Sequence, residues 1–498
     1  MPLSVQIRRH VERLIADGVL VPEAKLPATR DLAHALRLNR ATVAVAYDAL
    51  VAEGWAHAHV GQGTFVADRR APPPPSPPER TPAVPLQWDG ALSRAARRLL
   101  DEARRRQGTE VTGNPGVISF LGASPDPTLF PTEEFRRALN HVIKREGGAL
   151  LEYHPVAGYV PLRRHLTAWL GRHGIEAREE EVLVVNGSQQ GLDLIARALI
   201  DPGDAVLVEE PTYPGALQAF AAAQARLVPV SMGPEGLRVD LLPALVDQHH
   251  PKLLYCQPSG HNPTGVSLPP ATRLALLEIA RRSRLAVVED GFGAPDEGAG
   301  ATTPLRALDR HGLVIHLGTL SKILFPGLRV GWMVAPPALV APILRIKQLA
   351  DLNTGALLQA AVFRFCQGRR LERQARLIRA EYGRRRAALL SALERELPSG
   401  STWTVPDENA FSLLVSLPEG LDAVDLLPRA LERGVAYAPG IFFFVGGGDG
   451  RALRLAYAAL PVPRIEDGVR RLGEVVREAQ RRRRRPAHPV GAGALPVV

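Results

Sequence analysis

Cysteine is almost absent from this sequence of 498 residues, which contains only Cys256 and Cys366. Two cysteines cannot build the disulfide framework of a small secreted domain. The sequence also lacks any apolar run of about 18 residues, the length that a membrane-spanning helix needs. Its first residues lack the basic and then apolar pattern of a signal peptide. These absences predict a cytoplasmic protein with no membrane partner.

The charge balance is moderately basic, with 61 Lys and Arg against 51 Asp and Glu and a net charge of +10. The excess is concentrated in two arginine-rich runs, 94–106 and 481–485, and the first falls in a predicted basic helix, 91–106. Residues 1–70 hold nine basic and seven acidic side chains. A positive charge permits a polyanionic partner, but this distribution does not by itself indicate one.

Proline divides the chain into domains. Eight of the 15 residues in 71–85 are proline, and such a stretch favours extended polyproline rather than a packed core. Residues 71–116 are therefore expected to link an N-terminal domain, 1–70, to a larger domain, 117–480. The remaining residues, 481–498, begin with the arginine run and continue with Pro, Gly and Ala, which predicts a disordered basic tail.

The first 70 residues have the pattern of three helices followed by a β-hairpin. The segments are, in order, 3–17, Thr29 (as the cap) to Leu36, Arg40–Glu53 after the capping Asn39, and Trp55–Val66 with breaks at Gly61 and Gly63. This order is typical of an α+β winged helix-turn-helix domain. Periodicity alone would also fit another small helical domain.

Four short motifs in this region are more specific. They are Leu26–Ala33, Asn39–Val43, Leu50–Gly54 and Gly61–Val66. In this order they resemble the DNA-binding domain of the GntR family. The resemblance implies that double-stranded operator DNA is a partner of this domain.

The same resemblance implies contacts with base edges in the major groove, with backbone phosphates and with the minor groove. The residues implied are, in that order, Arg40 and Thr42, then Lys25 and Arg30, then the hairpin tip with Gly61 and Gly63. Ala44 and Val45 stand where family members often carry arginine. Phosphate binding is therefore expected to be weaker, or to move to Arg37, His57 or His59.

In the second domain, helical patterns alternate with short apolar, β-branched runs. The runs are Val182–Val185, Ala205–Val208, Leu253–Cys256, Ala286–Val288 and Leu313–His316. Such alternation favours a largely parallel sheet with helices on both faces, an α/β fold of three layers. Three later segments predict a smaller α+β subdomain: Trp403–Val405, Phe411–Val415 and Ala452–Ala456.

Lys322 lies in a segment that suits a cofactor with an aldehyde and a phosphate. Its amine can form a Schiff base with an aldehyde. Thr319, Ser321 and Arg329 supply two hydroxyls and a guanidinium that suit a phosphate monoester. Pyridoxal 5'-phosphate carries both groups. Taken alone, the run fits equally well an exposed lysine and arginine on an ordinary loop.

Other polar residues follow predicted strands, where ligands of open α/β sheets bind. Ser188 opens a helix whose N–H groups can bind phosphate, and Tyr213 can stack on a ring. Asn262 can donate to a phenolate oxygen, and Asp290 can keep a pyridine nitrogen protonated. Each also has a purely structural alternative: a helix cap, a core tyrosine, a turn asparagine and a capping aspartate. Their combination favours the cofactor.

Asp290, Asn262, Lys322 and Arg329 together resemble the fold-type-I aminotransferases, and the resemblance runs from Ile118 to Glu478. It implies pyridoxal phosphate as the cofactor, with Lys322 as the Schiff-base lysine. The phosphate would be held by Ser188, Gln189, Thr319, Ser321 and Arg329, and the ring by Tyr213, Asn262 and Asp290. Arg454 matches the arginine that binds a substrate carboxylate. Tyr153 matches a tyrosine that reaches a neighbouring subunit's phosphate, which implies a homodimer.

One departure concerns activity, because Phe292 stands where these proteins usually carry a tyrosine hydroxyl against the ring oxygen. Cofactor binding is expected, whereas efficient turnover is not. The two domains in this order resemble the MocR subfamily of bacterial transcription regulators, which implies that the large domain senses pyridoxal phosphate or an amino compound. Two alternatives stay open: a working aminotransferase with a DNA-binding appendage, and a cofactor-free regulator that uses the fold only to dimerise.

Overall fold

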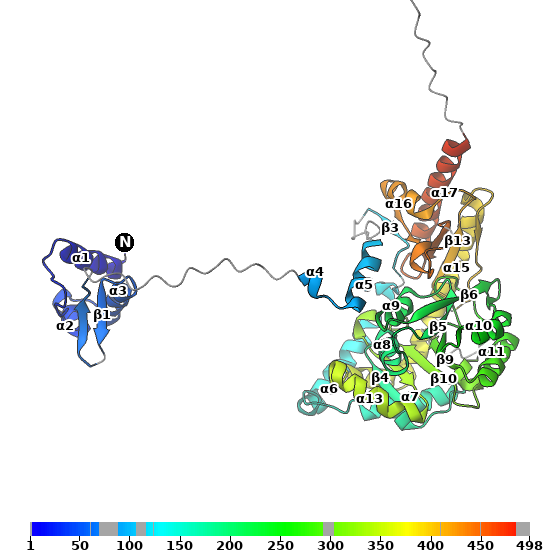
Figure 1. Cartoon of the computed structure of the whole chain (residues 1–498), viewed down its shortest axis with the longest axis horizontal. Helices are drawn as coiled ribbons and strands as arrows, with labels where there is room; N and C mark the ends of the chain where they lie inside the picture. The colour runs from blue at the N-terminus through cyan, green and yellow to red at the C-terminus, as the bar shows by residue number, and fades with distance from the viewer. Residues whose placement is uncertain are drawn as a thin grey trace, which may run out of the picture. The chain divides into compact units, whose positions relative to one another are not determined.

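The computed structural model describes residues 2–59, 61–68, 88–105, 116–122, 124–291, 303–408, 410–448 and 450–484. The chain divides into two compact units, Met1–Gly90 and Ala91–Val498, each described by itself (Figure 1). The proline-rich stretch 71–85, Phe292 and the last 14 residues fall outside the described ranges. The described residues include no helix that is both long enough and apolar enough to cross a bilayer.

The N-terminal unit contains the predicted three helices and hairpin. They are α1 (Leu3–Ala16), α2 (Thr29–Leu36), α3 (Arg40–Ala52), β1 (Ala56–His59) and β2 (Gly63–Val66). The Asn39 side chain caps α3 by accepting a hydrogen bond from Ala41 N at 2.9 Å. The predicted cap at Thr29 is wrong, because Ala28 precedes the helix and Thr29 is its first residue. The apolar faces of the three helices meet in a core around Val43 and Leu50.

The second unit is built on an eight-stranded sheet in the order β4-β11-β10-β9-β8-β5-β6-β7. The strands are β4 (Val182–Val185), β5 (Ala205–Glu210), β6 (Arg226–Gly233), β7 (Gly236–Leu237), β8 (Leu253–Cys256), β9 (Ala286–Gly291), β10 (Val314–Thr319) and β11 (Gly331–Val334). The central strands β10, β9, β8, β5 and β6 are parallel, and β11 runs antiparallel to β10 and β4. All five predicted strands are present, and β6, β7 and β11 add to them.

Helices cover both faces of this sheet (Figure 1). Successive residues of a strand point to opposite faces. Val206 and Val208 accordingly pack with α8 (Ser188–Leu199) and α9 (Pro214–Ala222), whereas Leu207 packs with α11 (Pro270–Ser283). Burial on both faces explains why these strands read as continuous apolar runs.

The other helices of eight or more residues in this unit pack around the large sheet or belong to the small subdomain. They are α5 (Arg94–Arg105), α6 (Thr132–Leu150), α7 (Val160–Arg172), α10 (Leu242–His249), α13 (Pro337–Asp351), α14 (Ala356–Cys366), α15 (Arg370–Glu396), α16 (Ala423–Glu432) and α17 (Val462–Arg484). The predicted basic helix 91–106 corresponds to α5, which packs against α9. Helix α17 continues through Arg484, so the first four residues of the predicted tail are helical rather than disordered.

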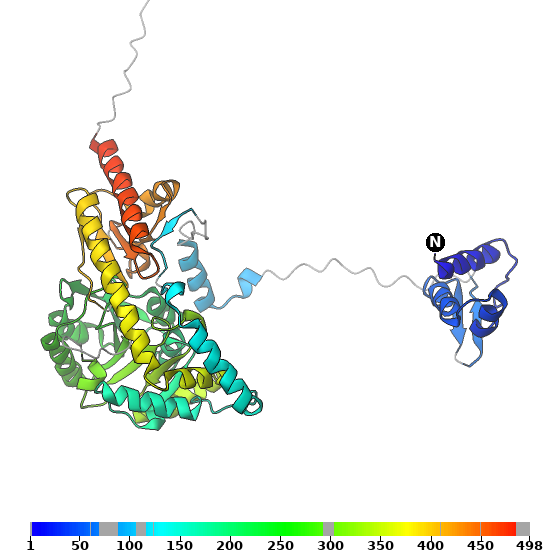
Figure 2. The ribbon, with the colours of Figure 1, turned by 180° about the vertical axis from the view of Figure 1, so that it is seen from behind.

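The small subdomain has an antiparallel sheet in the order β12-β13-β16-β15. These strands are β12 (Thr402–Trp403), β13 (Ser412–Ser416), β15 (Ala438–Pro439) and β16 (Ala452–Ala456). Figure 2 shows the long helix α15 alongside α17, and the two pack against each other. The short strand β3 (Ile118–Ser119) pairs with β14 (Val435–Ala436), which ties the start of the domain to this subdomain.

Candidate functional site

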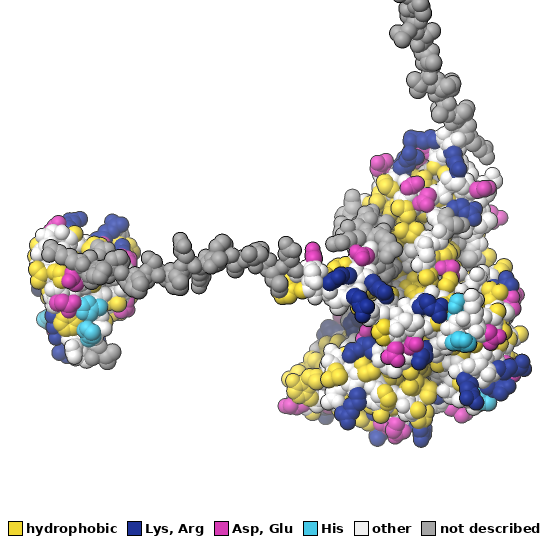
Figure 3. Space-filling model, in the orientation of Figure 1, with side chains coloured by type: hydrophobic (Ala, Val, Ile, Leu, Met, Phe, Trp, Pro, Cys, Tyr) yellow, Lys and Arg dark blue, Asp and Glu magenta, His cyan; other side chains and the backbone are white. Residues whose placement is uncertain are grey.

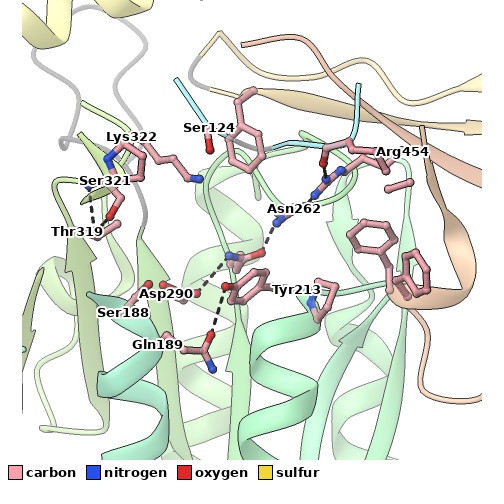
Figure 4. Close-up of a pocket in the computed structure, with 18 of the residues that line it drawn as sticks. Ser124, Ser188, Gln189, Tyr213, Asn262, Asp290, Thr319, Ser321, Lys322 and Arg454 are labelled. Carbon is pink, nitrogen blue, oxygen red and sulfur yellow. Dashed lines mark hydrogen bonds between the residues drawn. The ribbon is translucent and has the colours of Figure 1, made fainter. Parts of the chain in front are cut away.

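A cavity of about 540 Å³ opens at the carboxyl ends of the parallel strands, between the large sheet and the small subdomain (Figure 4). Polar side chains from distant parts of the chain line it. Among them are the predicted residues Ser188, Gln189, Tyr213, Asn262, Asp290, Thr319, Ser321, Lys322, Arg329 and Arg454. Tyr153, which the resemblance assigns to a neighbouring subunit's phosphate, does not line this cavity and is 84% exposed. The volume suits a small cofactor together with a small ligand.

One end of the cavity collects groups that bind anions. Ser188 is the first residue of α8, whose N-terminal N–H groups can bind an anion. Thr319 Oγ1 donates to Ser321 Oγ at 2.9 Å, which brings these two hydroxyls together. Arg329 adds a guanidinium at the same end, where its Nη2 donates to Asn186 O at 2.9 Å. This end therefore fits a phosphate.

A buried ion pair that the sequence did not reveal supports this end. Lys347 in α13 is fully buried, and its Nζ donates to both carboxylate oxygens of Asp351 at 2.7 and 2.9 Å and to Thr354 Oγ1 at 3.0 Å. Asp351 Oδ2 also accepts from the side-chain amides of Asn186 at 2.7 Å and Gln190 at 2.8 Å. The pair therefore holds the turn between β4 and α8.

The turn between β4 and α8 also fixes the position of Arg329. Gln190 Oε1 accepts from Asn186 N at 2.8 Å, and the carbonyl of Asn186 accepts from Arg329. An added Cβ at Gly187, where φ is +77°, would lie 2.5 Å from Arg329 Nη2, so the turn needs glycine. Lys347 and Asp351 are thus positioning residues for the arginine at the phosphate end.

The middle of the cavity holds a carboxyl group that lacks a full set of partners. Asp290 is buried in β9, and its Oδ2 accepts from Tyr255 Oη at 2.8 Å and Gln257 Nε2 at 3.3 Å. Its Oδ1 has no hydrogen-bond partner among the described residues. Burial raises the pKa of Asp290 to about 6. A protonated ring nitrogen of pyridoxal phosphate would supply the missing donor, so the site fits this cofactor.

Lys322 lies beside this carboxyl group with its Nζ 5.0 Å from the centre of the Phe411 ring. Burial, together with the positive charges of Arg454 and Arg329, lowers the pKa of Lys322 to about 8, although Asp290 opposes the shift. A lysine with this pKa has a useful neutral fraction near pH 7, and the neutral amine is the nucleophile. The arrangement is suited to reaction with an aldehyde.

Arg454 in β16 closes the other end of the cavity. Its Nη1 donates to Asn262 Oδ1 at 3.1 Å, its Nη2 donates to Leu121 O, and its Cζ lies 5.0 Å from the centre of the Phe443 ring. Burial lowers the pKa of Arg454 to about 10. Because Asn262 Oδ1 accepts from the arginine, the amide NH₂ group of Asn262 is available to donate to a ligand.

Two lining residues connect the others. Gln257, which the sequence reasoning missed, accepts through Oε1 from Asn262 N at 3.1 Å and donates through Nε2 to Asp290. Its position directly after β8 was the available signal. Gln189 donates to Gly215 O at 2.9 Å and accepts from Tyr213 Oη at 3.2 Å, so its side chain fixes the tyrosine ring. Because the side chain of Gln189 makes these two bonds, the predicted contact of Gln189 with phosphate would come from its backbone N–H group.

The predicted DNA-contacting residues lie on the surface of the N-terminal unit. Arg40, at the start of α3, is exposed, and Thr42 is half-buried in the same first turn. Lys25 and Arg30 are exposed, as are the two glycines of the hairpin, Gly61 and Gly63, which have φ values of +80° and +118°.

Histidines gather on one face of the N-terminal unit (Figure 3). The rings of His57 and His59 lie 5.1 Å apart, and each lies 5.9 Å from Phe65. On the face of the second unit that Figure 3 shows, basic and acidic side chains are interspersed. The hairpin of the N-terminal unit therefore presents two histidines, His57 and His59, at its surface.

We predict that Asp290→Asn stabilises the cofactor-free protein at pH 8 but not at pH 4. The folded-state pKa of about 6 lies above the ordinary 3.8, so the carboxyl group costs stability above pH 6 and costs none below pH 4. The full cost is of the order of 3 kcal/mol. Thermal unfolding across this pH range measures it, with Asp193→Asn, on the exposed side of α8, as control. An equal shift at both pH values would contradict the assignment.

We also predict that Asp351→Asn weakens pyridoxal phosphate binding at least tenfold without touching the cofactor. The change leaves Lys347 buried without a counter-charge, which costs about 3–5 kcal/mol of stability in comparable pairs. The double variant Lys347→Met, Asp351→Leu removes both charges and should recover stability. It should still bind the cofactor weakly, because Asn186 and Gln190 lose their acceptor. Wild-type affinity in the double variant, measured by equilibrium dialysis, would show that the pair does not position Arg329.

Two protein families match the chain. Residues 3–66 match the bacterial regulatory proteins of the gntR family, and residues 122–472 match aminotransferase class I and II. Both matches confirm the predicted order of a winged helix-turn-helix and a fold-type-I aminotransferase-like domain.

Individual relatives fall into two groups. A probable rhizopine catabolism regulatory protein, MocR of Rhizobium meliloti, is 31% identical over 95% of this chain and 93% of its own length. A 2-aminoadipate transaminase of Thermus thermophilus is 39% identical over 79% of this chain and 98% of its own length. A crystal structure of LysN, the α-aminoadipate aminotransferase of Thermus thermophilus complexed with N-(5'-phosphopyridoxyl)-L-leucine, is 38% identical with a TM-score of 0.73. It covers 80% of this chain and all of its own.

The aminotransferases thus match the second unit, whereas the regulator matches both units. The chain belongs to the aminotransferase class I and II family and, through its gntR-family domain, to the MocR-type regulators that join the two domains.

Proposed function

We propose that this protein is a DNA-binding transcription regulator whose second unit uses pyridoxal phosphate to sense the cofactor itself or an amino compound. The observation that carries the proposal is a cofactor pocket with its lysine, aspartate and phosphate-binding groups in a chain that also has a gntR-family domain. The similarity to MocR of Rhizobium meliloti over both domains supports it.

Pyridoxal phosphate is the cofactor of the second unit, and when bound it supplies an aldehyde that condenses with amines and a ring that accepts electrons. The residues of this chain have separable roles toward it. The N-terminus of α8, with Ser188, and the guanidinium of Arg329 bind the phosphate. Asp290 would hold the proton on the ring nitrogen, and Lys322 would supply an amine whose lowered pKa increases its neutral fraction.

The N-terminal unit binds double-stranded DNA. Exposed Arg40 and half-buried Thr42 at the start of α3 are placed to read base edges, while exposed Lys25 and Arg30 are suited to phosphates. The interaction of a positively charged side chain with phosphate carries no sequence information. Sequence selection in the operator therefore depends on α3.

We also propose that the protein is a homodimer. The turn after helix α6 and the end of α13 expose large apolar side chains: Leu151 (79% exposed), Tyr153, Leu349 (83%) and Leu352 (52%). Figure 3 shows hydrophobic side chains gathered over the end of α6. Such a patch is typical of an interface. A second copy would cover it, place Tyr153 beside the neighbouring phosphate and bring two DNA-binding domains to two half-sites.

A working aminotransferase remains a second candidate. The 39% identity to the 2-aminoadipate transaminase and the presence of Lys322, Asp290 and Arg454 in one pocket favour it. Multiple turnovers with an amino donor and a keto acid would distinguish this function from sensing alone.

We predict that Lys322→Ala abolishes the visible absorption band that pyridoxal phosphate has in the wild-type protein. The variant removes the amine that bonds to the aldehyde, whereas the phosphate end stays intact. Equilibrium dialysis should therefore still detect weak cofactor binding. A wild-type absorption band in the variant would exclude Lys322 as the anchor and leave the fold as a scaffold.

We predict that Arg40→Ala reduces operator binding at least tenfold and leaves pyridoxal phosphate bound. The probe is a DNA fragment that the wild-type protein selects from a random duplex pool, tested by gel shift at fixed salt. Arg282→Ala, on the exposed face of α11 in the second unit, removes the same charge and should have little effect. Cofactor loss in the Arg40 variant would contradict the division of roles between the two units.

A further inference from the structure

We infer that the amino compound sensed by this pocket is a monocarboxylate amino acid with an apolar side chain. The inference deepens the proposed function, on which it rests, by naming the chemical class of the effector. It depends on how the charged and apolar lining residues are distributed along the cavity.

Among the described residues, four charged side chains line the cavity, and each has a separate place. Arg329 donates to Asn186 O at the phosphate end, and Asp290 accepts from Tyr255 Oη and Gln257 Nε2 at the ring position. Lys322 lies at the position where an amine must arrive. Arg454 is therefore the cation that remains for a carboxylate of the effector.

Arg454 is prepared for that role. The residue is 7% exposed, and its Nε has no hydrogen-bond partner in the part of the chain that the structure describes. The bonds from its Nη1 to Asn262 and from its Nη2 to Leu121 fix the plane of the group. A carboxylate is the ligand whose two oxygens match a fixed guanidinium fork.

Apolar side chains line the part of the cavity near Lys322 and Arg454. The Phe411 ring lies 5.0 Å from Lys322 Nζ, and the Phe443 ring lies 5.0 Å from the Arg454 Cζ. Leu121, Ala438 and Phe442 line the same end, where Ser124 contributes a hydroxyl. Figure 4 shows Ser124 and Arg454 on the same side of the cavity, across from Asp290 and Ser188.

This wall selects against a second charge on the effector. An additional carboxylate or ammonium group would lose water and face aromatic rings without a counter-charge from the described lining residues. An alkyl side chain of the same length would instead bury its surface against those rings. The preference for an apolar effector is the difference between the binding free energies of these two kinds of side chain.

Three amino acids of similar chain length test the inference: L-norleucine, L-2-aminoadipate and L-lysine. Each is titrated into the full-length protein loaded with pyridoxal phosphate, and the change in visible absorption gives its Kd. The midpoint of thermal unfolding at saturating ligand is a second readout. We expect norleucine to bind at least tenfold more tightly than the other two.

A pair of variants tests the wall itself. Phe442→Arg places a positive charge on the lining and should shift the preference at least tenfold toward 2-aminoadipate. Phe444→Arg makes the same change two residues further along, outside the lining residues, and should leave the preference unchanged.

Tighter binding of 2-aminoadipate or lysine to the wild-type protein would overturn the inference. So would the absence of any response to the three compounds in protein that retains its cofactor. In the latter case, operator binding measured with and without pyridoxal phosphate tests the proposed function separately, because the cofactor alone would then be the effector.

Discussion

The site depends on ionisable side chains that are buried although some of their polar atoms lack a hydrogen-bond partner among the described residues. Asp290 lies in the interior with one carboxylate oxygen unpaired among the described residues, and Lys322 and Arg454 lie near it with lowered pKa values. Burial of such groups costs free energy in the protein without ligand. A cofactor that brings a ring N–H, an aldehyde and a phosphate offsets that cost, so binding and stability are linked.

The neighbouring residue shows how differently the fold treats a structural carboxylate. Glu289 precedes Asp290 in β9 and so points to the opposite face. It accepts hydrogen bonds from Leu305 N at 2.7 Å, Arg306 N at 3.0 Å and His316 Nδ1 at 3.0 Å. Burial alone would raise the pKa of Glu289, but these bonds lower it. A complete set of donors marks Glu289 as structural, and the incomplete set marks Asp290 as functional.

The same reasoning separates the positioning groups from those that meet the ligand. Lys347 and Asp351 satisfy each other and hold the turn before α8, whereas Arg329, which donates to Asn186 O in that turn, lies at the phosphate end. Regulation requires more than this pocket. An effector changes operator binding only if it binds unequally to two arrangements of the protein.

The sequence by itself determined the two domain types, the five apolar strands of the large sheet and most of the polar residues that line the pocket. These features depend on local patterns: glycine and asparagine at turns, β-branched runs, and polar motifs directly after strands. Asn39 shows the strength of such signals, because its side chain caps α3 by bonding to the backbone N–H of Ala41, only two residues away.

The tertiary structure decided what depends on residues far apart in the chain. Lys347 and Asp351 are four residues apart in α13, a common spacing for an ion pair on a helix. The pair holds the turn before α8 only because α13 packs beside Asn186 and Gln190. Strand β11 is four residues long and gains its place from pairing with β4 and β10. The apolar wall beside Arg454 arises because Phe411 before β13, strand β15 with the segment after it, and Leu121 after β3 converge on one cavity, and no local pattern records that convergence.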